Sequence, residues 1–149
     1  MAEVYFYHLT ESTLEEALPP LLEKSLQRGW WAVVQTGSEE RRDALDAHLW
    51  TWREDSFLAH GTDRDTHPEH QPVLLTTGTA NMNGAKARFL VDGAEPGDVT
   101  TYERTVLIFD GHDEGQLGAA RSHWRVLKEA GHEVTYWQQS SERRWERKA

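Results

Sequence analysis

The stretch Arg104–Gln138, which reads RTVLIFDGHDEGQLGAARSHWRVLKEAGHEVTYWQ, decides the fold. Its first seven residues form an apolar run that predicts a buried strand. Residues 114–130 place apolar side chains at helical spacing, which predicts an amphipathic helix, and residues 132–138 predict a second strand. Near-continuous apolar strands that alternate with helices indicate a mostly parallel sheet with helices on both faces.

The rest of the chain continues this alternation of strands and helices. Further strands are expected at residues 4–9, 31–35, 56–60, 72–77 and 88–91. One helix is expected from a capping box in residues 12–16 to a stop at Gly29, and another over residues 37–49. We predict an α/β fold with a single domain over residues 1–139. Residues 140–149 are expected to form a polar tail, with Trp145 as its candidate anchor.

The composition narrows the class of protein. The chain has 149 residues and no cysteine, which excludes disulfides, thiolate metal sites and a cysteine nucleophile and agrees with a cytoplasmic location. No apolar run approaches 18 residues and the N-terminus does not resemble a signal peptide, so no membrane association is expected. A net charge of −9 disfavours direct nucleic-acid binding, which depends on neutralising phosphates, and favours a protein partner.

The last thirty residues are basic and aromatic although the body of the chain is acidic. From Ala119 onward there are seven Lys and Arg against four Asp and Glu. At 100° per residue, three cations of the predicted helix lie within about a quarter-turn of Trp124, namely Arg121, Arg125 and Lys128. A positive patch that carries a tryptophan suits an acidic peptide with an apolar end.

Two interpretations of this helix stay open. An ordinary core stripe would also explain the spacing of Leu117, Ala120, Trp124 and Leu127. The cations would then be a solvated flank. The aromatic pair Tyr136 and Trp137 in the following strand favours a binding site, since large aromatic side chains are common anchors of protein interfaces.

A nucleotide-binding enzyme of the Rossmann or P-loop class is an alternative. The strand Val106–Asp110 followed by Gly111 resembles the acidic end of a Walker B strand. A phosphate-cradling loop also needs Gly-Lys-Ser/Thr, whereas Gly84 is followed by Ala85-Lys86-Ala87. No motif supplies a nucleophile or a catalytic base. We therefore expect no intrinsic catalysis and no cofactor.

A metal-binding protein is a second alternative, because a polar loop gathers five possible ligands: His60, Asp63, Asp65, His67 and His70. Zinc needs three or four ligands in a fixed tetrahedron. Histidines and carboxylates at such spacing are common in polar loops that bind no metal. We expect no metal here. Trp50 and Trp52 are either the edge of the core or anchors of a protein interface.

A resemblance to a known family rests on segments that occur in a characteristic order. These are VYFYH at 4–8, LDAHLW at 45–50, Ser56-Phe57 with His60, PVLLT at 72–76, RTVLIFDG at 104–111, WRVLKEAGHEVTYWQ at 124–138 and WERKA at 145–149. Over nearly its whole length the chain resembles the chi subunit family of bacterial DNA polymerase III. The family is an accessory component of the clamp-loader complex.

The resemblance implies a three-layer α/β/α, Rossmann-like fold with no bound nucleotide and no catalysis. It also implies a role as an adaptor in DNA replication. In the family, chi links the clamp loader, through the psi subunit, to the C-terminal tail of single-stranded DNA-binding protein. That tail is acidic and ends in Pro-Phe with a free carboxylate, which suits a basic and aromatic patch.

The resemblance also assigns expected roles to individual residues. By position Arg121 matches the tail-binding arginine, with Trp124 and Arg125 beside it. A lysine one turn earlier in the family aligns with Leu117, so Lys128 is expected to compensate for the missing charge. Tyr136 is expected to wall the pocket, and we expect Trp137 to help shape it. The partner surface, toward psi or a helicase, is expected to comprise Trp50, Trp52, Phe57 and His60.

Overall fold

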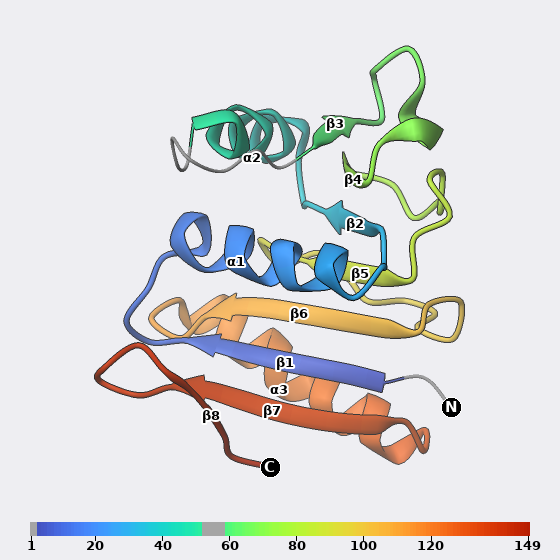
Figure 1. The fold of residues 1–149 in the computed structure, drawn as a ribbon. Helices are drawn as coiled ribbons and strands as arrows, with labels where there is room; N and C mark the ends of the chain where they lie inside the picture. The colour runs from blue at the N-terminus through green and yellow to red at the C-terminus, as the bar shows by residue number, and fades with distance from the viewer. Residues whose placement is uncertain (1–2, 52–58) are drawn as a thin grey trace.

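The computed structural model describes residues 3–51 and 59–149, so Trp52, Phe57 and most of the strand expected at 56–60 lie outside the described residues. Within the described part, eight strands form one sheet in the order β3-β4-β2-β5-β6-β1-β7-β8 (Figure 1). All neighbouring pairs are parallel except β7 and β8. The strands are β1 (Glu3–Leu9), β2 (Ala32–Gln35), β3 (His60–Thr62), β4 (Val73–Thr76), β5 (Ala87–Leu90), β6 (Arg104–Asp110), β7 (Glu133–Gln139) and β8 (Trp145–Arg147).

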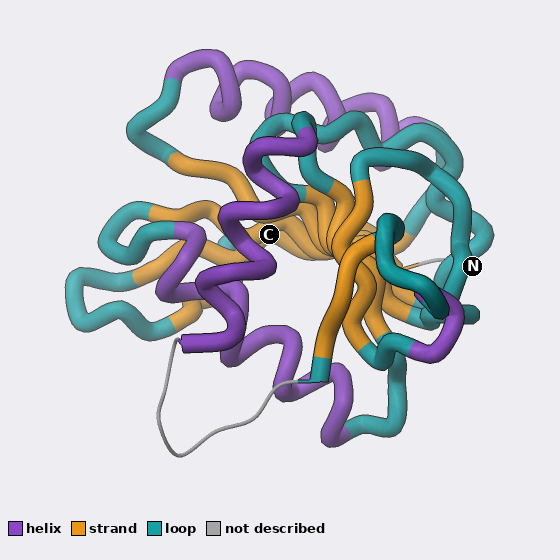
Figure 2. Tube along the Cα trace, turned by 90° about the horizontal axis from the view of Figure 1, so that it is seen from above, coloured by secondary structure: helices purple, strands orange, loops and turns teal. Residues whose placement is uncertain are grey.

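Three helices cover the two faces of this sheet. The helices are α1 (Leu14–Gln27), α2 (Glu39–Thr51) and α3 (Glu114–Glu129). Helices α1 and α2 lie on one face and α3 lies on the other, which Figure 2 shows from above. Each side has its own apolar core, with Leu18 and Leu22 of α1 on one face and Ala120 and Leu127 of α3 on the other. The predicted three-layer α/β/α fold is confirmed.

Helix α1 begins and ends where the sequence indicates. Thr13 and Glu16 form a reciprocal capping box at its start, and Gly29 has a φ of 85° just beyond its end. Pro19 lies inside the helix and lacks the N–H that would bond to the carbonyl of Glu15. The ring of His48 on α2 contacts that carbonyl instead, with Nε2 2.7 Å from the oxygen. The proline therefore opens a position at which α1 and α2 are joined.

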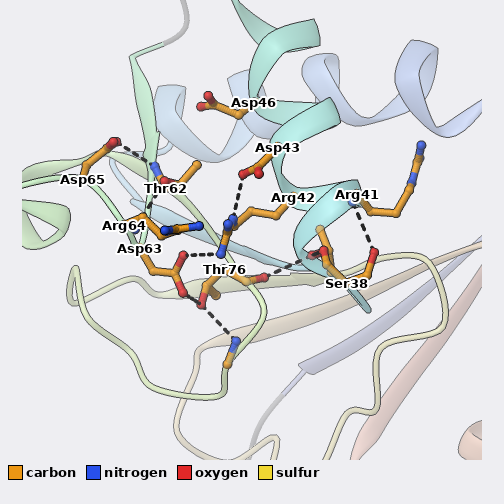
Figure 3. Close-up of polar contacts among 12 residues, drawn as sticks. Ser38, Arg41, Arg42, Asp43, Asp46, Thr62, Asp63, Arg64, Asp65 and Thr76 are labelled. Carbon is orange, nitrogen blue, oxygen red and sulfur yellow. Dashed lines mark hydrogen bonds and ion pairs between the residues drawn. The ribbon is translucent and has the colours of Figure 1, made fainter.

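A buried arginine fixes α2 to the edge of the sheet. Arg42 is only 1% exposed, and its guanidinium pairs with Asp43 at 3.0 Å and with Asp63 at 3.1 Å (Figure 3). The other oxygen of Asp63 accepts a hydrogen bond from the Thr76 hydroxyl at 2.9 Å. The network thus joins α2, the segment after β3 and the end of β4.

The last ten residues are not the free polar tail that the sequence predicts. Residues 145–147 form β8, which pairs antiparallel with the end of β7. Trp145 is the reason, because its ring packs on Tyr7 with the two centroids 4.8 Å apart and closes over the core on the α1 face. The candidate anchor therefore makes this segment part of the sheet.

Among the helices of the described residues, none combines the length and the apolar character needed to cross a membrane.

Candidate functional site

A basic and aromatic pocket of about 680 Å³ lies against α3, β6 and β7. We call it the α3–β7 pocket. It is lined by Phe109, Leu117, Ala120, Arg121, Trp124, Arg125, Lys128, Glu129, Tyr136 and Ala149. The structure therefore brings together the predicted residues of α3 and Tyr136. The lining residue Ala149 shows that the C-terminal segment also contributes, because its carbonyl accepts a hydrogen bond from the Tyr136 N–H at 3.3 Å.

The cations of the pocket are exposed and available. Arg121, Arg125 and Lys128 follow one another along the exposed flank of α3, and none of them forms an ion pair within residues 3–51 and 59–149. The Lys128 ammonium lies 5.1 Å from the centre of the Trp124 ring, a cation–π contact that orients it toward the pocket. Within the described residues these charges are left for a ligand.

Trp124 agrees with both interpretations of α3, as a residue of the core and as a residue of the binding site. Its ring packs edge-on against Phe6 at 5.5 Å and against Tyr136 at 5.6 Å, so one part of it belongs to the core. It is only partly buried, and it also lines the pocket. The core stripe and the binding-site interpretation therefore describe two sides of the same residue.

Trp137 does not line the α3–β7 pocket, contrary to our expectation that it shapes the slot. Side chains alternate between the two faces of a strand, so Tyr136 faces α3 while Trp137 faces the other side of the sheet. There it stacks on Tyr7, with an angle of 12° between the rings and their centroids 6.3 Å apart. Adjacent positions in a strand cannot both wall one pocket.

His8 supports the pocket from beneath and was missed by the sequence reasoning. Its Nδ1 lies 2.7 Å from the Tyr136 hydroxyl, and its ring stacks on Phe109. Burial is the main cause that lowers the pKa of His8, and nearby His112 and Arg121 lower it further. The neutral imidazole can then accept a hydrogen bond from the Tyr136 hydroxyl at Nδ1 and hold the Tyr136 ring in place. The strand period places His8 on the same face as Phe6, but only the position of β7 beside β1 shows that His8 meets Tyr136.

Replacement of His8 should flatten the dependence of stability on pH. Because the folded state lowers the pKa of His8 below its usual 6.5, the unfolded chain binds this proton more readily. The free energy of unfolding should therefore fall as the pH drops below about 6.5, and His8→Gln should reduce that fall. Urea unfolding followed by circular dichroism across this range measures it. The exposed His70→Gln is the control, and identical profiles for His8→Gln and the wild type would contradict the assignment.

A second crevice, of about 330 Å³, lies at the carboxyl ends of the adjacent strands β1 and β6. The chain leaves β1 toward α1 and leaves β6 toward α3, and ligands of α/β proteins commonly bind where neighbouring strands diverge in this way. Three successive amides after β1 point at one acceptor, the side-chain oxygen of Gln139. Their distances are 3.3 Å from Thr10, 3.2 Å from Glu11 and 3.0 Å from Ser12.

This arrangement disfavours the nucleotide-binding alternative. Consecutive amides can bind a phosphate, but here the protein's own carboxamide occupies them. Glu11 and Asp110 add negative charge to the crevice, and its one arginine, Arg41, is already paired with Glu15 and Asp92. Asp110, the residue that resembled a Walker B acid, accepts a hydrogen bond from the His112 N–H in the turn after β6.

The five possible metal ligands of the His60–His70 loop are not brought together. His60 is buried and points its Nε2 at the Asp46 carbonyl, 3.0 Å away. Asp63 pairs with Arg42, and Asp65 accepts the Thr62 N–H. The five groups are separated because secondary structure begins within the loop and uses His60, Asp63 and Asp65. His67 and His70 remain close to Glu69 around the short 3₁₀ helix at Pro68–His70, and all three are exposed.

Trp50 and His60 form a second surface on the α2 side of the sheet. Trp50 is 55% exposed, so it belongs to the surface and not to the core. Its ring lies 4.3 Å from that of His60, which is buried beneath it. His60 is therefore placed to support Trp50 rather than to meet a partner itself.

The fold and the pocket define a class of α/β protein without a free phosphate site in the described part of the chain. The backbone amides after β1 bind the protein's own Gln139, and a basic, aromatic pocket lies on the flank of α3. The family model for the DNA polymerase III chi subunit, HolC, matches residues 1–135, and the chain belongs to this family. A curated relative, the probable DNA polymerase III subunit chi of Rickettsia prowazekii (strain Madrid E), is 23% identical over 109 residues. The match covers 73% of this chain and 66% of the relative, slightly under two thirds of its length. Members of the family are non-catalytic accessory subunits of DNA polymerase III.

Proposed function

We propose that the α3–β7 pocket binds the acidic C-terminal tail of single-stranded DNA-binding protein and links that protein to the clamp loader. The observation that carries the proposal is the set of three exposed cations, without ion-pair partners among the described residues, around an apolar floor. The pocket volume of about 680 Å³ lies within the range usual for ligand sites, about 300–1,000 Å³. In this role the protein acts in the cytoplasm.

The chemistry of the pocket suits both ends of such a tail. Guanidinium groups at Arg121 and Arg125 pair with carboxylates, and charge-assisted hydrogen bonds of this kind are about twice as strong as neutral ones. Leu117, Trp124 and Tyr136 offer an apolar slot for the terminal phenylalanine. Leu117 replaces a charge with apolar surface, and Lys128 over the Trp124 ring supplies the second contact to the tail.

Reversal of the charge at Arg121 tests the proposal. A fluorescein-labelled Asp-rich peptide that ends in Pro-Phe with a free carboxylate should bind the wild type, with an affinity that falls as salt rises. Arg121→Glu is expected to weaken binding at least about tenfold, because about 1.4 kcal/mol corresponds to tenfold and a charge-assisted contact is worth about 1.5–3 kcal/mol. Fluorescence anisotropy at two salt concentrations measures this loss.

Two controls locate the effect. Arg64→Glu makes the same charge change at an exposed position far from α3, and it should keep the affinity within about twofold, since surface charges there are screened. A peptide that lacks its terminal phenylalanine should bind the wild type much more weakly. Equal binding of both peptides, or an unchanged affinity in Arg121→Glu, would reject the proposed site.

We also propose that the surface around Trp50 contacts the clamp loader through a psi-like subunit, or else contacts a helicase. The observation behind this proposal is the exposed ring of Trp50, which packs on the buried ring of His60. Tryptophan is among the commonest anchors of protein interfaces. Trp50→Ala added to the anisotropy series should leave tail binding intact. The same variant used as bait in a cell extract should lose the partner that Arg121→Glu retains.

A further inference from the structure

A second recess lies on the opposite face of the sheet, between the end of α1 and strands β1, β5 and β6. We call it the α1–β1 recess. Its volume is about 190 Å³, and it is lined by Tyr7, Leu21, Lys24, Ser25, Arg28, Trp30, Phe89, Arg104 and Val106. Its base is apolar, with Leu21, Phe89 and Val106 buried and the rings of Tyr7 and Trp30 partly exposed, whereas its rim is polar and basic.

The charge around the recess is positive although the whole chain carries −9. Arg104 is neutralised by Glu3, with Nη2 2.9 Å from the carboxylate. Lys24 and Arg28 are exposed and have no carboxylate partner among residues 3–51 and 59–149. The rim therefore presents two cations that are not neutralised by an ion pair in the described structure.

Aromatic rings hold the two guanidinium groups in fixed positions. Arg28 lies over the ring of Trp30 at 4.1 Å, and Arg104 lies 5.2 Å from the same ring and 4.2 Å from that of Tyr5. A guanidinium that is stacked on a ring keeps its N–H edge available for an oxyanion. Because Glu3 already binds the edge of Arg104, the guanidinium that stays available is that of Arg28, and its stacking on Trp30 lowers the entropic cost of binding a carboxylate.

We propose that the α1–β1 recess is a second docking site, for an acidic peptide segment that inserts one bulky apolar side chain. The volume of about 190 Å³ and the partly exposed rings of Tyr7 and Trp30 suit a single apolar side chain. Lys24 and Arg28 complement the acidic residues that flank it. Single-stranded nucleic acid is the less suitable ligand, because a body of charge −9 repels a run of phosphates whereas a short segment meets only the rim.

A capped peptide separates this site from the α3–β7 pocket. The probe is a labelled acidic hexapeptide with one internal phenylalanine, acetylated at its start and amidated at its end, so that it has no terminal carboxylate. The wild type should bind it with a shift in the Trp30 indole N–H resonance, which Trp30→Phe assigns. Lys24→Glu combined with Arg28→Glu should weaken binding at least tenfold.

Matched variants decide which site is responsible. Arg121→Glu should leave binding of the capped peptide within twofold, so the recess can fail or succeed independently of the tail-binding proposal. Because Lys24 lies in the last turn of α1, Lys24→Gln with Arg28→Gln is measured as well, and this milder pair should stay folded while still weakening binding. Unchanged binding in a folded variant, loss of binding in Arg121→Glu, or tighter binding of oligo-dT than of the peptide would overturn the proposal.

Discussion

Arg42→Met is expected to lower the free energy of unfolding by about 3–5 kcal/mol, the usual cost when one partner of a buried ion pair is removed. The side chain of Arg42 is almost completely buried, and its guanidinium contacts Asp63, whose carboxylate is itself mostly buried. Without the arginine, the Asp63 carboxylate keeps, among the residues that the structure describes, the Thr76 hydroxyl bond alone. Its charge is then left uncompensated beside an apolar core. Urea unfolding followed by circular dichroism measures the loss.

The neighbouring arginine provides the matched control. Arg41 also makes two ion pairs, at 2.8 Å to Glu15 and 2.9 Å to Asp92, but its side chain is 38% exposed. Exposed pairs contribute about 0–1 kcal/mol because water and salt screen them. Arg41→Met should therefore cost less than about 1 kcal/mol. Equal losses in the two variants would show that burial does not set the value of these pairs.

The fold was predictable because its strands are apolar runs and its helices carry ordinary start and stop signals. The segment Arg104–Asp110 was predicted with both of its boundaries, and α1 begins and ends at its capping box and glycine. Such signals are local, so one sequence suffices to read them. The failure at residues 140–149 has the opposite cause, since β8 depends on Trp145 meeting Tyr7, which is far away in the sequence.

The candidate site was predicted on α3 and only partly on the sheet. Helical spacing placed Arg121 and Trp124 on one face, and the structure agrees. To predict which strand residues line the pocket, both the two-residue period of a strand and the order of the strands in the sheet are needed. The period of two places the side chains of Tyr136 and Trp137 on opposite faces of β7. His8 required the knowledge that β1 lies next to β7, which no local pattern gives.

Gln139→Met is expected to lower the free energy of unfolding by about 3 kcal/mol, because each hydrogen bond contributes about 1 kcal/mol and a lone buried donor costs more. The side chain of Gln139 accepts from three backbone amides of residues 10–12 and donates to the Ser12 hydroxyl at 2.9 Å. Methionine has a similar length and no such acceptor. Gln138→Met is the control one residue earlier, where the side chain makes no hydrogen bond among the described residues, and should cost less than about 0.5 kcal/mol.

The same variant tests why a sheet of this topology needs no nucleotide. The loss in Gln139→Met should not be restored by phosphate, because Glu11 and Asp110 line the crevice and its Arg41 is already paired with Glu15 and Asp92. Inorganic phosphate, or ATP with magnesium, should leave the melting temperatures of both proteins unchanged. Stabilisation of the wild type by either ligand would revive the nucleotide-binding alternative. Stabilisation of the variant alone would show that Gln139, more than the surrounding carboxylates, keeps phosphate out.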